Sequence, residues 1–484
     1  MSENKGSLQQ RLTQVNEYER QPVPKKSVKG FKSFVGMVAG EHIAGTEFII
    51  GPLFVLHGVG ILDIFLGLFI GNLLATLSWT LVCAPAAVKT RLTIFYQLEK
   101  ISGVGLVSIY NIINGILFCV TASAMIGVSA SAVGLLLNVE GPGLTDLYPT
   151  SFLWIVIIFC IGLVITVVAT FGFDRVSKFA NIFAPWMPLV FLASGIAMLP
   201  GLGITSLDTF WALAEEKIWT GVPVEGQTKY TLWHVIIFAW LCNSSMHLGL
   251  ADMSIYRYAK KSYYGLASAF GMFIGHYMAW IASGILCAVA LQNGNMNPTP
   301  GEIAFMGAGL AGAICVVVAG WTTANPTIYR AGLAVQALLP TFKRWKVTMI
   351  VGVTATVMAC SPAIISKLDQ FLGLYALLAS PVGAVVIMDI FVFPKVGLRQ
   401  NLAELKKMRV NISVLLAWSV ALFASYVIYE RTNADFYFFV AVPGWIIGGL
   451  SYLMFAFLQQ RYFIATSKGD SPGSPHKKWD YEAS

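Results

Sequence analysis

The feature that most constrains this chain is a series of long apolar stretches that recur along almost its whole length. A stretch of about 20 apolar residues is long enough to cross the hydrocarbon core of a bilayer as a helix. Such segments lie at about 34–57, 61–85, 104–137, 150–171, 178–200, 230–256, 263–292, 302–338, 347–365, 370–392, 411–429 and 435–459. Only 12% of the residues are charged, about half the share in soluble proteins. We therefore predict an all-α integral membrane protein with twelve transmembrane helices.

The basic residues predict which helix ends face the cytoplasm. If the N-terminus is cytoplasmic, all but four of the 32 Lys and Arg residues fall in cytoplasmic segments, Arg257 and Arg330 among them. Because cytoplasmic loops are enriched in Lys and Arg, we predict that both termini are cytoplasmic and that the protein lies in the cell membrane. The net charge of +8 then reflects this sidedness and does not indicate binding to nucleic acid.

The order of segments predicts one membrane domain and no soluble domain. This domain covers residues 33–459, between a cytoplasmic N-terminal tail (1–32) and a cytoplasmic C-terminal tail (460–484). The seven cysteines lie in or at the ends of apolar segments and form no CxxC pair. We interpret them as packing residues and expect no resident metal or cofactor.

The first apolar segment is interrupted by charge and glycine. Residues 40–47 include Glu41, His42, Glu47 and two glycines in the middle of the segment. A charged side chain at the bilayer centre costs roughly 2.5–3.5 kcal/mol, and freed backbone groups are tolerated there only beside a cavity or inside protein. We predict a broken helix that forms one wall of a polar site. The alternative is a kink or re-entrant turn whose charges pair with neighbouring helices.

The sixth segment carries a second polar interruption, made of Asn243, Ser244, Ser245 and His247 and followed by Gly249. Interruptions in spans one and six, at corresponding positions of two five-helix halves, are typical of inverted-repeat transporters, in which half-helix ends face the substrate. The alternative is that these side chains only join helices to each other. The repeat interpretation divides the membrane domain into a first repeat (33–200), a second repeat (230–392) and two extra helices (411–459).

A third polar cluster lies in the eighth segment. Thr322 and Thr323 offer hydroxyl oxygens, which are hard ligands of the kind that a small cation such as Na⁺ prefers. With unwound carbonyls from the first segment they would complete an oxygen cage, while Asn325 offers an amide to a polar ligand. The alternative is a kink at Pro326 whose hydroxyls bond back to the helix.

Motifs in three parts of the chain resemble one transporter family, the nucleobase:cation symporter family one, which includes cytosine, purine, allantoin, thiamine and hydantoin permeases. They lie at 65–72 with 89–93, at 251–258 and at 321–329. The resemblance covers nearly the whole chain in segment order and number. It implies a leucine-transporter-like fold, with two inverted five-helix repeats plus two extra helices. It also implies uptake of a flat heterocycle with Na⁺ or H⁺ by alternating access.

The same resemblance implies an ion site and a substrate site. Sodium would be bound by the hydroxyls of Thr322 and Thr323 and by the backbone carbonyls of Ala319 and Ala39. The substrate, a small neutral heterocycle, would lie among segments one, three, six and eight. Its predicted contacts are Ala44, Glu47, Phe48, Asn114, Phe118, Trp240, Asn243, Ser245, His247 and Asn325.

Two choices stay open at this point. Glu41 and His42 form an alternative proton relay, since proton-coupled transporters use such intramembrane groups. The substrate is expected to be a nucleobase or a related ring such as cytosine or a purine. The alternatives are allantoin, hydantoin, thiamine or an amino acid carried by the same fold.

Other functions are less well supported by the residues. An enzyme is not expected, because Glu41-His42 is not part of an HExxH motif and no convergent nucleophile or metal set accompanies it. Asp252 and Arg257 lie near cytoplasmic helix ends and are interpreted as solvated groups or gate ion pairs. We interpret His276 as structural or interfacial. The protein is expected to function as a monomer.

Overall fold

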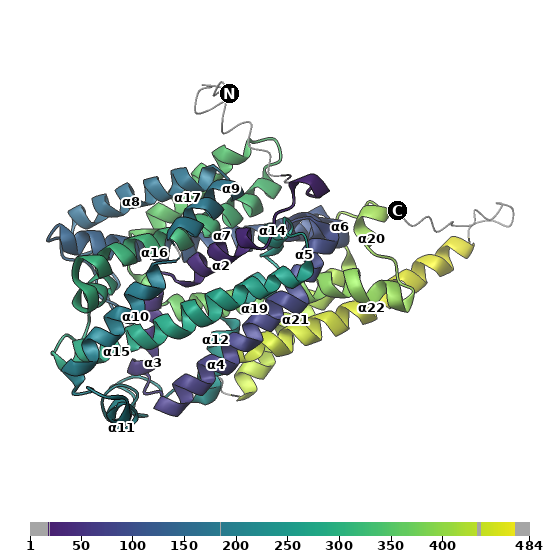
Figure 1. Cartoon of the computed structure of the whole chain (residues 1–484). Helices are drawn as coiled ribbons and strands as arrows, with labels where there is room; N and C mark the ends of the chain where they lie inside the picture. Colours follow the sequence, from purple (N-terminus) through teal and green to yellow (C-terminus); the bar gives the residue numbers. More distant parts are fainter. Residues whose placement is uncertain (1–17, 19, 184, 433–436, 470–484) are drawn as a thin grey trace, which may run out of the picture.

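The computed structural model describes residues 18, 20–183, 185–432 and 437–469, which form a helical bundle (Figure 1). Within these residues, β-structure is limited to two isolated bridges. The predicted all-α class is therefore confirmed. Most of the predicted N-terminal tail (1–32) and of the predicted C-terminal tail (460–484) lies outside the described residues.

Nine helical segments within the described residues are long and apolar enough to cross a membrane. They are Ile61–Thr90 (α4, η2 and α5), Val104–Leu136 (α7), Phe152–Thr170 (α8), Phe173–Leu202 (α9, α10 and η3), Ser262–Gln292 (η4, η5 and α15), Pro300–Leu338 (α16), Leu368–Val396 (α19, η6 and η7), Ile412–Thr432 (α21) and Tyr437–Phe463 (η8 and most of α22). Each of them overlaps one of the spans predicted from hydropathy.

The other three predicted spans are interrupted or short. Segment 34–57 is split into α2 (Lys32–His42) and α3 (Glu47–Leu56). Segment 230–256 is split into α12 (Leu232–Leu241), α13 (Ser244–His247) and α14 (Met253–Tyr256). Segment 347–365 corresponds mainly to α17 (Arg344–Ala359), which has 16 residues. The total of twelve membrane crossings therefore stays a prediction.

Loops predicted to lie on the same side of the membrane meet each other. Three contacts join segments predicted to be cytoplasmic, namely Val23 N to Arg91 O (3.0 Å), Lys29 N to Tyr258 O (2.6 Å) and Lys100 to Glu404 (3.1 Å). Two contacts join segments predicted to be outside, namely Tyr230 N to His57 O (2.9 Å) and Thr145 N to Asn297 Oδ1 (3.0 Å). This grouping agrees with the predicted alternation of loops, whereas the assignment of the first group to the cytoplasm stays a prediction.

Figure 1 shows the same separation at the level of helices. The short helices α5 (Ala84–Thr90), α6 (Ile94–Ser102) and α20 (Leu402–Leu405) gather at one end of the bundle, and α11 (Leu207–Lys217) lies at the opposite end. In the text below, the end that holds α5, α6 and α20 is called the inner end, and the end that holds α11 is called the outer end.

The most extensive helix pair of the bundle is formed by α7 and α16. Small residues let membrane helices approach closely, and Ser129 Oγ of α7 donates to the Val317 carbonyl of α16 at 3.1 Å. Gly320 lies in this contact, because a Cβ added there would stand 2.6 Å from the Met125 carbonyl oxygen. The pair therefore depends on the missing side chain at this position.

Replacing Gly320 with alanine is expected to destabilise the protein by about 1–3 kcal/mol, because overpacking a tight contact shifts neighbouring groups. Thermal unfolding of the purified protein in detergent measures this as a lower Tm. Gly201→Ala is the matched control, since a Cβ there meets no atom within 4 Å. An unchanged Tm for Gly320→Ala would contradict the packing described.

Candidate substrate and ion site

The first helix break consists of residues 43–46, between α2 and α3. Ile43 leaves helical geometry (φ −104°, ψ 63°), while its N–H still bonds to the Ala39 carbonyl at 2.9 Å. Gly45 lies against the backbone of α16, since a Cβ added to it would stand 3.2 Å from Gly320 N. The glycines thus let the break pack directly against α16, and the predicted interruption of the first span is confirmed.

The second break separates α12, α13 and α14. Asn243 has φ −111° and ψ 20° between α12 and α13, and Leu250 adopts the left-handed conformation (φ 63°) before α14. The Gly249 carbonyl accepts a hydrogen bond from Tyr110 Oη of α7 at 3.1 Å. Backbone groups freed by the break are thus bonded within the protein, as membrane depth requires, and the interruption predicted in the sixth segment is confirmed.

The two breaks meet at a small cavity with a volume of about 40 Å³. Three of the ten predicted substrate contacts line it, namely Ala44, Glu47 and Asn243. Glu41 and His42, predicted as an alternative proton relay, also line it. Since cavities that hold small molecules typically measure roughly 300–1,000 Å³, side chains around the cavity must move before a heterocyclic ring can enter.

Three predicted contacts from spans one and three lie in packed surroundings away from this cavity. Asn114 Oδ1 accepts a hydrogen bond from Tyr375 Oη at 2.8 Å, and the Phe118 ring stands edge-on to the same tyrosine at 5.4 Å. Phe48 stacks on Phe191 at 4.6 Å. These three side chains support the walls of the site and do not line it.

Two predicted contacts in the sixth segment are bonded to each other and to span two. Trp240 Nε1 donates to Ser78 Oγ at 3.0 Å. His247 Nε2 lies 2.9 Å from the Trp240 carbonyl oxygen, and its ring packs on Trp79 at 4.6 Å. Neither side chain lines the cavity.

The remaining two predicted contacts are also outside the lining. Ser245 is buried within α13. With its amide in the orientation that satisfies both partners, Asn325 donates to the Ile165 carbonyl (3.0 Å) and accepts from Trp321 Nε1 (3.2 Å). The Asn325 amide therefore joins α16 to α8 and points away from the cavity.

Glu47 is held by residues that the sequence analysis did not select. Trp280 Nε1 donates a hydrogen bond to its carboxylate, His276 Nε2 lies 3.7 Å from Oε1, and Ser283 Oγ donates to its backbone carbonyl at 2.7 Å. The His276 ring stacks on Trp280 at 4.4 Å and stands edge-on to His42 at 4.9 Å. This histidine is buried and lines the cavity beside a carboxylate. The interfacial interpretation of His276 is therefore wrong, whereas the structural one stays a prediction.

The predicted sodium ligands are close together in space. Thr322 Oγ1 donates to the Ala319 carbonyl at 3.1 Å. Thr323 Oγ1 lies 3.0 Å from the carbonyl oxygens of Ala319 and Glu41 and 3.5 Å from that of Gly40. This cluster of hydroxyl and carbonyl oxygens fits the preference of Na⁺ for hard oxygen ligands.

One predicted sodium ligand is used differently. The Ala39 carbonyl accepts the N–H of Ile43, so the carbonyls of α2 that face Thr323 belong to Gly40 and Glu41. Ala39 as a sodium ligand stays a prediction. This candidate sodium site is called the oxygen cluster below. It consists of the hydroxyls of Thr322 and Thr323 and the carbonyls of Ala319, Gly40 and Glu41.

Arg330 is not in a cytoplasmic loop, which corrects the sequence analysis. Helix α16 continues to Leu338, and Arg330 is fully buried in it. Its guanidinium is bonded to both carboxylate oxygens of Glu41 and, through Nε at 2.8 Å, to Asp252 Oδ1. Two carboxylates compensate the buried charge, so the helix need not end to bring the arginine to water.

Asp252 and Arg257 are also buried, so the interpretation of these residues as solvated groups is wrong. Asp252 accepts hydrogen bonds from Arg330 and from Trp79 Nε1 (2.7 Å). Arg257 Nη1 donates to the Tyr18 carbonyl at 3.0 Å. The other interpretation, that Asp252 belongs to a gate ion pair, stays a prediction that its pairing with Arg330 supports.

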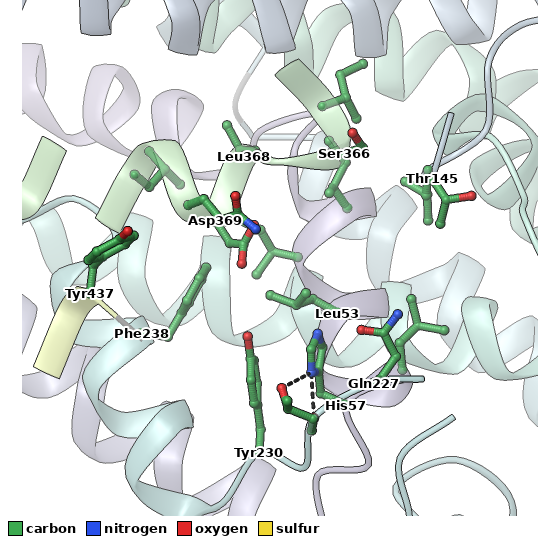
Figure 2. A pocket seen from close by; sticks show the side chains of 18 of the residues that line it. Leu53, His57, Thr145, Gln227, Tyr230, Phe238, Ser366, Leu368, Asp369 and Tyr437 are labelled. Carbon is green, nitrogen blue, oxygen red and sulfur yellow. Dashed lines mark hydrogen bonds between the residues drawn. The ribbon is translucent and has the colours of Figure 1, made fainter. Parts of the chain in front are cut away.

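A second and larger cavity opens toward the outer end, with a volume of about 470 Å³ (Figure 2). Figure 2 shows Asp369 and Tyr230 pointing into it from opposite sides. His57 Nδ1 lies 2.7 Å from the Thr228 carbonyl oxygen. Ile50, Leu368 and Leu372 line both cavities. A layer of three aliphatic side chains therefore separates the larger outer cavity from the small inner one.

Comparison with known proteins gives matches of fold at low sequence identity. No protein-family model and no curated protein matches this sequence. Mhp1, a nucleobase-cation-symport-1 family transporter, in a closed conformation with bromovinylhydantoin bound, matches with a TM-score of 0.68 and 15% identity, over 93% of this chain and 96% of that chain. A Na⁺-coupled sialic acid symporter in a substrate-bound outward-open state matches with a TM-score of 0.64 and 14% identity, over 93% of both chains. A manganese transporter of Eremococcus coleocola matches with a TM-score of 0.51 and 12% identity, over 94% of this chain and 97% of that chain.

These likenesses extend over nearly the full length of the chain and confirm the predicted leucine-transporter-like fold. The predicted resemblance to the nucleobase:cation symporter family is likewise confirmed at the level of fold. The matched proteins are membrane transporters, which agrees with the prediction that the chain is not an enzyme.

Proposed function

We propose that this protein is a secondary active transporter that imports a small nitrogen heterocycle together with Na⁺ by alternating access. The observation that carries the proposal is the meeting of two helix breaks at a small cavity, directly beside the oxygen cluster. Thr323 belongs to both features, since it lines the cavity and its hydroxyl faces the carbonyls of α2. A substrate and a cation bound there would contact the same broken helix.

The polar groups of the cavity favour a ring with N–H donors and carbonyl acceptors. The residues that line the cavity include Glu47, which has a carboxylate, Asn243, which has an amide, and Thr121, which has a hydroxyl. Flat heterocycles such as nucleobases and hydantoins carry complementary donors and acceptors at their edges. The hydantoin bound to Mhp1, a protein of the same fold, is a ring of this kind.

The larger outer cavity supports a path from outside. Its volume of about 470 Å³ lies within the range of roughly 300–1,000 Å³ for small-molecule sites. A ring arriving there would reach the inner cavity by displacing Ile50, Leu368 and Leu372, which line both spaces. Entry of a heterocycle from the outer side thus requires movement of this aliphatic layer and of the side chains around the inner cavity.

Coupling to H⁺ is the second candidate, and one observation favours it. Glu47, His276 and His42 form a buried carboxylate–imidazole cluster in the wall of the cavity, and such intramembrane groups serve as proton relays. Replacing external Na⁺ with choline at fixed pH separates the two ions. Sodium coupling predicts that uptake is lost, whereas unchanged uptake would favour the proton.

A thermal-shift screen of the purified protein tests the substrate class. Cytosine, hypoxanthine, hydantoin, allantoin, thiamine and leucine are each added with Na⁺ or with choline. We expect at least one heterocycle to raise Tm, and to do so more strongly in Na⁺, because a ligand that binds only the folded state stabilises it. Stabilisation by leucine alone would contradict the proposed substrate class.

Replacing Glu47 with glutamine is expected to weaken substrate binding and to leave the fold intact. Hydrogen bonds to charged groups contribute about 1.5–3 kcal/mol, so the KM for uptake of the ring found in the screen should rise roughly 10- to 100-fold. Trp280 can still donate to the amide oxygen, so Tm should change little. Glu140→Gln, at an exposed loop position, is the matched control. A normal KM for Glu47→Gln would show that Glu47 does not contact the substrate.

A further inference from the structure

The seventh span contributes a π-helix to the wall of the small cavity. This segment, η5 (Phe270–Tyr277), precedes α15 (Met278–Gln292). π-Helical segments are rare and are frequently found at functional sites. His276 of η5 lines the cavity, although the seventh span is not among the four spans predicted to contact the substrate. The π-helix therefore brings an additional imidazole to the site from a fifth span.

Two glycines of η5 let His42 of α2 pack directly against this π-helix. A Cβ added to Gly271 would stand 2.8 Å from His42 Nδ1, and one added to Gly275 would overlap the His42 carbonyl oxygen. The His42 and His276 rings consequently contact each other, with 4.9 Å between their centroids. Both residues are at most 4% exposed and line the same cavity, so the two imidazoles form one continuous part of its wall.

The hydrogen bond of His42 determines which of its ring nitrogens can accept. Nδ1 lies 2.7 Å from the Val38 carbonyl oxygen. A carbonyl oxygen only accepts, so Nδ1 carries the hydrogen, and Nε2 of the neutral imidazole holds a lone pair. The neutral form is expected because burying a charge without a partner is costly. Nε2 is buried and has no hydrogen-bond partner among the described residues.

His276 offers a second acceptor of the same kind. Its Nε2 lies 3.7 Å from Glu47 Oε1, so we place the hydrogen of the neutral ring on Nε2, near the carboxylate, and Nδ1 then holds the lone pair. Nδ1 is also buried, and the part of the chain that the structure describes gives it no hydrogen-bond partner. Buried polar groups in proteins are nearly always bonded. Two unbonded acceptors on neighbouring rings therefore point to donors that a ligand supplies.

Glu47 adds a third acceptor next to the two imidazoles. Trp280 Nε1 donates to its carboxylate, and the His276 ring stacks on Trp280 at 4.4 Å. A carboxylate has about four lone-pair sites, so a bond from one indole leaves capacity for a ligand. The wall formed by α2, α3 and η5 thus includes one carboxylate and two imidazole nitrogens, all of which accept hydrogen bonds.

We infer that His42 Nε2, His276 Nδ1 and the Glu47 carboxylate recognise a donor edge of the substrate, which carries at least two neighbouring N–H groups. The inference rests on the proposed function and narrows its substrate class to amino-substituted nitrogen heterocycles. A ring N–H beside an exocyclic amino group, as in isocytosine or guanine, supplies such an edge. An N–H flanked by two carbonyl groups, as in uracil, places oxygen lone pairs against the same acceptors. The site rejects that edge because its buried acceptors then stay unpaired.

Isocytosine and 4(3H)-pyrimidinone form a matched pair that tests the inference, because they differ only in the 2-amino group. The Kd of each ring for the purified full-length protein in Na⁺ is obtained from the rise in Tm with ring concentration. We expect the parent protein to bind isocytosine about tenfold or more tightly than the pyrimidinone, since its amino group pairs an acceptor that otherwise stays unpaired. Guanine and hypoxanthine, which differ in the same group, should show the same preference. This comparison needs no variant, so it decides the inference even where a substitution prevents folding.

Substitution of His276 tests whether this side chain produces the preference. His276→Phe keeps an aromatic ring against Trp280 but has no acceptor, so the Kd ratio within each pair should fall to about two or less. His276→Asn can place an amide oxygen near the position of Nδ1 and should keep most of the ratio, which a role in packing alone would not produce. His234→Phe, at a histidine that lines neither cavity, is the matched control and should leave the ratio unchanged.

The negative results separate the inference from the proposed function. If heterocycles raise Tm but both members of each pair bind equally, or only rings without the amino group bind, recognition of a donor edge is wrong and the transporter proposal stands. An unchanged ratio in folded His276→Phe would likewise overturn the inference, because another group would then read the amino group. If no heterocycle binds, the proposed substrate class is wrong and the inference fails with it.

Discussion

Replacing Arg330 with glutamine is expected to cause the largest loss of stability of any single substitution in the binding region. It leaves the carboxylates of Glu41 and Asp252 buried without their shared cation. Removing one partner of a buried ion pair typically costs about 3–5 kcal/mol, a large part of the stability of a typical domain. We therefore expect a fall in Tm and transport near background. Thermal unfolding in detergent and uptake into vesicles measure the two effects.

A matched control and a rescue make this prediction specific. Arg431→Gln removes an exposed arginine at the end of α21 and should change stability by less than about 0.5 kcal/mol. Adding Glu41→Gln to Arg330→Gln removes one of the unpaired charges, so the double variant should recover part of the lost Tm. The effects of substituting two residues in contact on the free energy of unfolding are not additive. A normal Tm for Arg330→Gln alone would mean that the two carboxylates do not depend on it.

Replacing Thr323 with alanine is expected to remove the response to sodium. The hydroxyl lies within 3.5 Å of three carbonyl oxygens, so it is the member of the oxygen cluster with the most oxygen neighbours. Losing it should weaken Na⁺ binding by about tenfold or more, which is about 1.4 kcal/mol. The increase in Tm produced by titrating NaCl against choline chloride measures the affinity, and uptake measures the functional loss.

Thr354→Ala is the matched control for this variant. Thr354 Oγ1 bonds to the carbonyl four residues earlier at 3.0 Å, as Thr323 Oγ1 does, but it lies on an exposed face of α17. Loss of such a local hydrogen bond alone should therefore leave the sodium response intact. An unaltered NaCl titration for Thr323→Ala would place the cation elsewhere in the protein.

The two helix breaks could be predicted from sequence because their physical signal is strong. Charged or amide side chains next to glycine are costly inside an apolar segment unless they line a cavity or are paired in protein. Residues 40–47 and 243–249 meet this condition, and both interrupt their helices in the structure. The adjacent hydroxyls of Thr322 and Thr323 could likewise be recognised as oxygen donors.

The side chains that line the cavity were harder to predict from sequence than the two helix breaks. Which face of a buried helix points inward depends on its rotation, and α7 is buried along most of its length, so its composition gives no direction. Asn114 and Phe118 were predicted as contacts from the family resemblance alone, yet they pack with Tyr375. Trp280 was missed because the sequence around a tryptophan in an apolar helix does not indicate that its indole N–H bonds to a buried carboxylate.

Arg330 was misplaced for a different reason. It was counted among the cytoplasmic basic residues although it lies within the predicted span 302–338, because Lys and Arg are normally enriched on the cytoplasmic side. The apolar run 331–335 that follows it was the available signal that the helix continues, and an arginine within such a run is functional by default. Its carboxylate partners come from α2 and from the residue before α14, which only the tertiary structure brings together.

Accumulation of a radiolabelled heterocycle in proteoliposomes tests the central claim most directly. Purified protein is reconstituted in K⁺-loaded liposomes, which are diluted into Na⁺ or choline buffer with the ring that gave the largest thermal shift. We predict uptake above the external concentration in Na⁺ only, and none in liposomes that carry Thr323→Ala. Equal accumulation in choline, or none in either buffer, would contradict a cation-driven heterocycle site at the two helix breaks.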